Sequence, residues 1–184
     1  MNTCLIVVDL QNDYFPGGSM ELVGIEEAAA NAQLLLREFR KAKLPVIHIQ
    51  HIAARPGATF FLPETDGAKI NQRVTPLDDE EVVVKNFPNS FRDTTLLEIL
   101  KKSKIENLLI CGAMSHMCID ATTRAAFDLG FNCTVAEDAC ATRDLVFKGK
   151  TIKASDVHAS FMAALSAPYA KVITTLEIIK GMVE

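Results

Sequence analysis

The chain has no long hydrophobic segment, because none of its apolar runs approaches the roughly 20 residues that a membrane-spanning helix needs. Its first three residues lead directly into strand-like sequence, without the charged region or cleavage site of a targeting peptide. We therefore expect a cytoplasmic protein that has no membrane partner.

The sequence also lacks an excess of positive charge. Lysine and arginine total 19 against 23 aspartates and glutamates, and they are scattered rather than gathered into a stripe. A phosphate backbone is bound by such a stripe, so we expect no nucleic-acid partner. Hydrophobic residues make up 49% of the 184, as in a compact protein. Because the chain shows no repeat, low-complexity segment or linker, residues 1–184 are predicted to form a single domain.

The five cysteines form no recognisable framework, since there is no Cys-x-x-Cys pair and no Cys/His cluster with the spacing of a structural zinc site. Cys4, Cys111 and Cys133 stand in apolar runs and are expected to be buried. Cys140 is placed in a polar loop. We therefore expect neither disulfides nor a bound metal, which leaves Cys118 without a structural explanation.

Short β-branched runs alternate with longer segments in which apolar residues recur every three or four positions. This alternation is typical of βαβ units and predicts an α/β fold with six parallel strands. The strands are expected at residues 3–8, 45–50, 81–85, 107–111, 133–136 and 171–174. The helices are expected at residues 26–43, 94–104, 118–129 and 152–167.

Two connections, at residues 11–24 and 51–79, are too long and too polar to be simple turns. Loops of this length usually carry function. The second contains Phe60 and Phe61 close to Gly57, which favours a partly apolar flap. The flap could fold over a pocket or pack against another subunit, and the sequence leaves both uses open.

Three chemically versatile side chains follow three of the predicted strands. Asp9 follows the apolar run 4–8, Lys85 follows the run 82–84, and Cys118 comes shortly after the run 108–112. In an open parallel sheet, ligands bind just outside the carboxyl ends of the strands. We therefore predict that the three side chains converge in one crevice.

Each of the three residues suits a role in attack on a carbonyl group. Cys118 stands where a helix is expected to begin, so the helix N-terminus and the Lys85 ammonium would favour its thiolate. Asp9 would accept the thiol proton and deliver it to a leaving amine, and the backbone N–H groups of Met114 and Cys118 would stabilise the oxyanion. Such acyl transfer to water needs no cofactor. Taken singly, Asp9 suits a loop-capping role and Lys85 a solvated position better than catalysis, and Cys118 suits a buried structural role as well as a catalytic one, so the prediction rests on the combination.

Three segments resemble the signatures of isochorismatase-like cysteine hydrolases: residues 7–15 (VVDLQNDYF), 84–91 (VKNFPNSF) and 112–124 (GAMSHMCIDATTR). The match spans nearly the whole chain, and three motifs in order at strand ends are specific in combination. The resemblance implies a Rossmann-like three-layer α-β-α fold and a catalytic triad of Asp9, Lys85 and Cys118. It also implies a cis peptide bond between Ala113 and Met114 that turns the Met114 amide towards the oxyanion.

Members of this family commonly form dimers or tetramers and hydrolyse amides such as nicotinamide, carbamoyl amines or ureido acids. The resemblance therefore implies a homodimer or homotetramer that acts on a small-molecule substrate. Isochorismatase proper cleaves an enol ether and usually lacks the cysteine, so Cys118 favours hydrolysis of an amide, carbamoyl or imide-like C–N bond through an acyl-enzyme. An isochorismatase-type ether or ester hydrolase, and an inert scaffold of the same fold, are the alternatives.

Metal-binding nicotinamidases of the family carry an Asp-x-His and a further His after the second strand, but residues 48–52 read HIQHI and lack the aspartate. This departure supports the prediction of no metal. His48 is expected within the strand, and His51 is favoured as a pocket residue, whereas His116 and His158 are given no role. The other residues placed in the pocket, each of which equally suits core packing, are Phe15, Phe87, Phe91 and Met117.

The spacing Cys118-x5-Arg124 also matches that of cysteine phosphatases, but the segment lacks their glycines. As a helix it would carry Arg124 away from the thiol, so we expect no phosphatase site. An activated Cys118 would be alkylated well below the usual thiol pKa of about 8.5, which would distinguish an enzyme from an inert scaffold.

Overall fold

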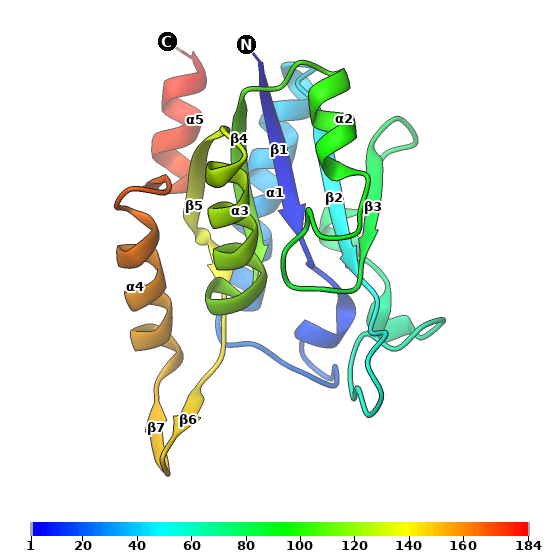
Figure 1. Ribbon diagram of the computed structural model, residues 1–184, viewed down its shortest axis with the longest axis vertical. Coiled ribbons are helices and arrows are strands. Elements are labelled where there is room, and N and C mark those ends of the chain that lie inside the picture. Colours follow the sequence, from blue (N-terminus) through cyan, green and yellow to red (C-terminus); the bar gives the residue numbers. More distant parts are fainter. Residues whose placement is uncertain (1, 184) are drawn as a thin grey trace.

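The computed structural model describes residues 2–183 and has a six-stranded sheet at its centre (Figure 1). The strands lie in the order β3-β2-β1-β4-β5-β8, and all neighbouring strands are parallel. The predicted Rossmann-like α/β fold is confirmed. The strand bounds are β1 (Thr3–Val8), β2 (Val46–His51), β3 (Glu81–Lys85), β4 (Asn107–Ala113), β5 (Asn132–Ala141) and β8 (Lys171–Ile173).

Helices cover both faces of the sheet (Figure 1). Leu5 and Val7 of β1 pack in the cluster that contains α1 (Ile25–Lys41) and side chains of α5 (Thr175–Val183). The alternate residues Cys4, Ile6 and Val8 pack on the opposite face, with side chains of the other three helices. The continuous apolar run of β1 follows from this burial on both faces. The helices of the second face are α2 (Leu96–Lys102), α3 (Asp120–Asp128) and α4 (Ala154–Leu165). Within residues 2–183, none of the helices is long and apolar enough to cross a membrane.

The predicted bounds of β1 and β3 agree with the structure, but β4 and β5 extend further than expected. After an irregularity beyond Ile110, β5 resumes pairing with β4, so that Gly112 faces Cys140. Cys140 is therefore a buried strand residue, and its placement in a polar loop is wrong. The polar pair at residues 137–138 hides this continuation in the sequence.

The unpredicted elements include a helix and a hairpin. The first is α5, whose N-terminus carries a reciprocal cap: the Glu177 carboxylate accepts a hydrogen bond from Thr174 N at 2.9 Å, and Glu177 N donates to Thr174 Oγ1 at 3.3 Å. The second is an antiparallel hairpin of β6 (Leu145–Phe147) and β7 (Lys150–Ile152). Its turn residues Lys148 and Gly149 both have positive φ, as a tight two-residue hairpin requires.

The two long loops are fastened to each other. The Gln11 side chain donates to the His51 and Ala68 carbonyls at 2.8 Å and accepts from His51 N at 2.7 Å. The Asp13 carboxylate accepts from Phe61 N at 2.6 Å, and the Phe61 ring packs against Tyr14 with centroids 4.5 Å apart. The flap is therefore held against the first loop of its own chain.

A second polar cluster joins α1, β2 and the turn before β3. The Glu80 carboxylate accepts hydrogen bonds from Arg40 Nε and Nη2, both at 2.8 Å, and contacts His48 Nε2 at 3.0 Å. Burial opposes ionisation of Glu80, but hydrogen bonds from Arg40, the Leu77 amide and His48 outweigh it and lower the Glu80 pKa to about 2. The expected place of His48 inside β2 is correct, and its side chain is engaged by this cluster.

We predict that Glu80→Gln lowers the free energy of unfolding near neutral pH and has less effect in acid. Because the Glu80 pKa is depressed in the folded protein, its contribution is complete above the ordinary value of 4.5 and is lost as the pH falls towards about 2. Urea unfolding at a series of pH values measures the difference between variant and wild type. Glu106→Gln, at an exposed glutamate, is the control. A difference that does not shrink in acid would contradict the assignment.

Candidate active site

Asp9 follows β1 at the point where the strand order of the sheet reverses, between β1 and β4. The residue has a φ of 52°, a left-handed conformation that aspartate tolerates better than most residues. Its N–H donates to the Ile49 carbonyl at 3.0 Å, which fixes it against β2. The carboxylate is fully buried, and within residues 2–183 its Oδ1 atom accepts no hydrogen bond.

Lys85 is the last residue of β3 and is also buried. Its Nζ atom lies 2.8 Å from Asp9 Oδ2 and 3.2 Å from Cys118 Sγ. It also lies 3.1 Å from His51 Nδ1 and 3.1 Å from the Phe87 carbonyl oxygen. One ammonium therefore joins the three residues that the sequence places at separate strand ends.

Cys118 lies in the segment that follows β4. Before this segment enters the crevice, the end of β4 passes very close to the end of β1. Gly112 lies beside Val8 with a φ of 124°, and a Cβ at this position would stand 2.0 Å from the Val8 carbonyl oxygen. The Ala113–Met114 peptide bond that follows is cis. Cys118 then lies in a π-helical turn, Ser115–Ile119, rather than in the first turn of α3. Only glycine fits at position 112, where β4 lies against the backbone of Val8. The π-helical turn that follows places the Cys118 sulfur 3.2 Å from Lys85 Nζ.

The protonation states within this cluster differ from those expected. Burial, and then the charge of Asp9, raise the pKa of the Cys118 thiol well above its usual range, although Lys85 acts in the opposite direction. The predicted effect of Lys85, which lowers the thiol pKa, is confirmed, but the expected net preference for the thiolate is wrong for the resting protein because burial and Asp9 outweigh it. Burial also lowers the pKa of Lys85, but Asp9 and Cys118 outweigh it and the net pKa is raised. The resting cluster is an Asp9–Lys85 ion pair beside a neutral thiol.

The same atoms resemble a metal site in part. Ligand atoms of Asp9, His51 and Cys118 lie within 4.8 Å of one another. Lys85 Nζ, however, contacts all three, so a metal ion would have to displace a buried ammonium from its carboxylate. The donor set fits the lysine better than a cation, and the absence of a metal stays a prediction.

A cavity of about 450 Å³ opens next to the cluster. Its walls include Met117, which precedes Cys118, and Asn86, which follows Lys85. Of the predicted pocket residues, His51, Phe87 and Met117 line the cavity. Phe60 of the flap lines it as well, so the flap covers a pocket of its own chain.

Phe15 and Phe91, which were also placed in the pocket, do not line this cavity. Phe15 is buried in the core cluster on the α1 face of the sheet. Phe91 packs against the cluster on the other face, where its ring stacks on Phe131 with centroids 6.1 Å apart. Arg55 and Arg143 line the cavity and were not predicted to do so. Arg143 follows β5, so the strand-end rule that found Asp9 could have found it.

Two histidines left without a role brace the segment around Cys118. His158 Nδ1 lies 2.8 Å from Ser115 Oγ, and His116 Nδ1 lies 2.6 Å from Thr142 Oγ1. Arg124 points away from the thiol, as expected: its Nε atom donates to the Asp120 carboxylate at 2.8 Å. The segment therefore does not form a phosphate-binding loop.

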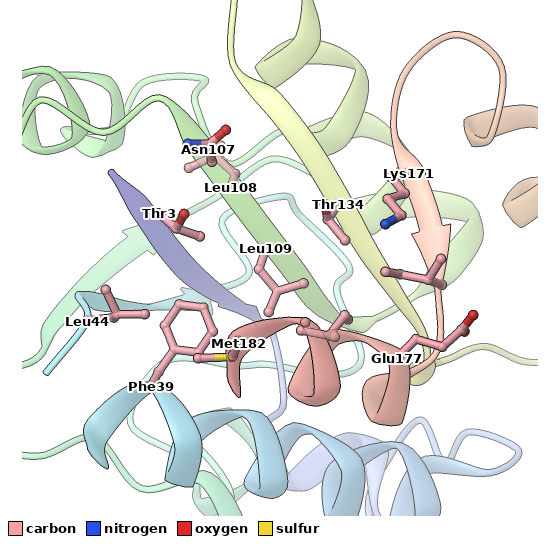
Figure 2. Close-up of a pocket in the computed structure, with 13 residues that line it drawn as sticks. Thr3, Phe39, Leu44, Asn107, Leu108, Leu109, Thr134, Lys171, Glu177 and Met182 are labelled. Carbon is pink, nitrogen blue, oxygen red and sulfur yellow. The ribbon is translucent and has the colours of Figure 1, made fainter. Parts of the chain in front are cut away.

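A second cavity, of about 300 Å³, lies between the sheet and helices α1 and α5 (Figure 2). Thr3, Asn107 and Lys171, which line it, are the first residues of β1, β4 and β8. The cavity is therefore at the amino end of the sheet, opposite the triad. Ligands of open parallel sheets bind at the carboxyl end, so the first cavity is the candidate site.

We predict that Lys85→Met lowers activity at least about tenfold to a hundredfold, because the ammonium no longer holds Asp9 and Cys118. The variant should also lose about 3–5 kcal/mol of stability, since a buried Asp9 carboxylate is left unpaired. Adding Asp9→Asn removes that charge, so the double variant should be more stable than Lys85→Met alone. Urea unfolding tests this order, and equal stability of the two variants would contradict a buried ion pair.

Comparison with known proteins assigns the chain to a family. Residues 3–177 match the isochorismatase domain model. The chain is 49% identical over 180 residues to the isochorismatase family protein YddQ of Bacillus subtilis, covering 98% of this chain and 100% of that one. A crystal structure of a putative isochorismatase hydrolase from Oleispira antarctica is 52% identical, with a TM-score of 0.94 over 97% of this chain and 96% of the other. Nicotinamidase 3 of Arabidopsis thaliana is 27% identical over 75% of this chain and 72% of its own length. The chain belongs to the isochorismatase family of hydrolases.

Proposed function

We propose that this hydrolase cleaves the C–N bond of a small amide, carbamoyl or imide-like molecule through a thioester at Cys118. The observation that carries the proposal is the position of Lys85 Nζ, 2.8 Å from the Asp9 carboxylate and 3.2 Å from the Cys118 sulfur. A nucleophile, a proton acceptor and a fixed positive charge are thus in contact beside a cavity. Similarity to a nicotinamidase supports an amide substrate.

The first half of the reaction forms the thioester. As the Cys118 sulfur attacks the carbonyl carbon, its proton passes to Asp9, whose buried Oδ1 has a free acceptor position within the described chain. The raised pKa of the thiol agrees with proton transfer during attack rather than before it. The oxyanion accepts hydrogen bonds from the N–H groups of Met114 and Cys118. When the C–N bond breaks, the leaving amine takes the proton from Asp9.

The second half releases the acid. Water attacks the thioester carbonyl while Asp9 accepts its proton, and the sulfur regains that proton as the C–S bond breaks. Lys85 stays protonated throughout, which agrees with its raised pKa. Every proton that moves is carried by Asp9, sulfur, water or the amine, so these steps call for no cofactor.

A panel of primary amides, ureido acids and cyclic imides tests the proposal. Each substrate is assayed for loss of the C–N bond through the products of its class. We expect at least one member to be hydrolysed: a primary amide would give equal yields of ammonia and carboxylate, a ureido acid would give ammonia, carbon dioxide and the amine, and a cyclic imide would open to one new carboxylate with its nitrogen retained as an amide. Turnover of an enol ether or ester, with no turnover of any C–N substrate, would contradict the proposal and favour an ether or ester hydrolase. No turnover of either kind would favour an inert scaffold.

We also infer that the chain folds as one domain and forms a homodimer or homotetramer. Val146 and Phe147 on the β6–β7 hairpin are 72% and 65% exposed, which is unusual for adjacent large apolar side chains. Contact with a second copy would bury them. Sedimentation equilibrium measures the assembly, and a monomer at all concentrations would contradict it. A cytoplasmic location stays a prediction.

A further inference from the structure

The cavity beside the triad has a charge opposite to that of the whole molecule. The chain carries a net charge of −4. Among the described residues that line the cavity, however, two are arginines, Arg55 and Arg143, and none is an aspartate or glutamate. The rest of the wall is largely apolar, with Met20, Phe60 and Phe87 among its members.

These two arginines also differ from every other arginine of the chain. Five of the seven arginines have a carboxylate oxygen within 4.0 Å. Within residues 2–183, Arg55 and Arg143 have no such partner. Asp144 follows Arg143 directly, but its carboxylate is bound by Lys153 at 2.9 Å and by the Ala154 N–H at 2.8 Å. The five paired arginines are Arg37, Arg40, Arg73, Arg92 and Arg124.

The inner end of the cavity does not supply a compensating negative charge. Asp9 is neutralised by Lys85 at 2.8 Å, and the raised pKa of Cys118 leaves the thiol uncharged. Burial, with Lys85 and Arg55, outweighs Asp9 and lowers the pKa of His51, so its ring is neutral as well. The uncompensated charge that faces the cavity is therefore positive.

We propose that Arg55 and Arg143 form a carboxylate-binding subsite, and that the substrate is a small amide or carbamoyl compound with a carboxylate at the end away from the scissile bond. This inference rests on the proposed function for the kind of bond that is cleaved, whereas the binding of a carboxylate by the two arginines does not depend on it. Guanidinium groups present paired N–H donors that match a carboxylate. The apolar residues of the same cavity accommodate the carbon skeleton, and the subsite orients the carbonyl towards Cys118.

The test compares two alkylating reagents of similar size at Cys118, iodoacetate and iodoacetamide, of which only the first is an anion. Rates are measured by mass spectrometry of the Cys118 peptide at about pH 9, where more of the thiol is ionised. We expect the iodoacetate-to-iodoacetamide rate ratio to fall about fivefold to tenfold in the Arg55→Met/Arg143→Met double variant, because the positive field of the cavity is removed. High salt should lower the ratio in the wild type but not in the double variant.

Arg37→Met is the matched control, because Arg37 is an exposed arginine on α1 with an acidic partner, and its ratio should equal that of wild type. An unchanged ratio in the double variant would overturn the subsite. The measurement needs no turnover, so it separates the subsite from the reaction. If C–N substrates are hydrolysed but this ratio does not change, only the subsite fails. If the ratio changes but no C–N substrate reacts, only the proposed function fails.

Discussion

Cys118→Ala is expected to abolish hydrolysis, with kcat lower by at least about 10⁴-fold, because the remaining groups of the cluster can bind the substrate but cannot form the thioester. The side chain is small and 4% exposed, and its loss removes one of four acceptors around Lys85 Nζ. The fold should therefore persist, with a near-native circular dichroism spectrum. Initial rates on the most active C–N substrate measure the loss.

Cys133→Ala is the matched control for this prediction. Cys133 is another buried free thiol, but it lies in β5 and its sulfur contacts the backbone oxygens of Thr123 and Phe131. Its removal should leave kcat close to that of wild type. If Cys118→Ala keeps more than a few per cent of the wild-type rate, Cys118 is not the nucleophile, whatever its contacts.

Asp9→Asn should separate the ionisation of the thiol from its ability to react. In the wild type, burial and the Asp9 charge raise the pKa of Cys118, while Lys85 lowers it. Replacing the carboxylate by an amide removes one raising contribution and keeps Lys85, so the thiol pKa should fall. Turnover should nevertheless decrease at least about tenfold to a hundredfold, because no group then accepts and returns the proton.

The two effects of Asp9→Asn are measured separately. The rate of Cys118 alkylation by iodoacetamide is followed against pH, and its midpoint should move to lower pH in the variant than in the wild type. Asp78→Asn, which changes an exposed aspartate, should alter neither the midpoint nor kcat. A midpoint that rises would contradict the effect of the Asp9 charge on the thiol pKa, and activity that survives the substitution would show that Asp9 is not the proton acceptor.

The sequence predicted the triad more completely than the pocket around it. A parallel sheet brings the carboxyl ends of its strands to one edge, so Asp9, Lys85 and Cys118 could be placed together from the positions of three apolar runs. No comparable rule tells from the sequence which aromatic side chains line the cavity. Phe87 lines the cavity whereas Phe91 stacks in the core, and nothing in the segment between them distinguishes the two.

Helix α5 and the β6–β7 hairpin were missed because the periodicity of apolar residues does not reveal a helix cap or a two-residue turn. The cap formed by Thr174 and Glu177 is a sequence signature of a helix start, and it could have predicted α5. The Lys148-Gly149 turn could likewise have predicted the hairpin. The raised pKa of Cys118 could not have been foreseen, because it depends on how deeply the thiol is buried relative to Lys85.

Trapping the covalent intermediate tests the central claim most directly. Wild-type protein is mixed with the best C–N substrate, quenched in acid during turnover and analysed by mass spectrometry after digestion. We predict that the peptide containing Cys118 gains the mass of the acyl group, and that Asp9→Asn changes the amount of this adduct. Rapid turnover with no adduct on Cys118, together with an active Cys118→Ala variant, would contradict the mechanism.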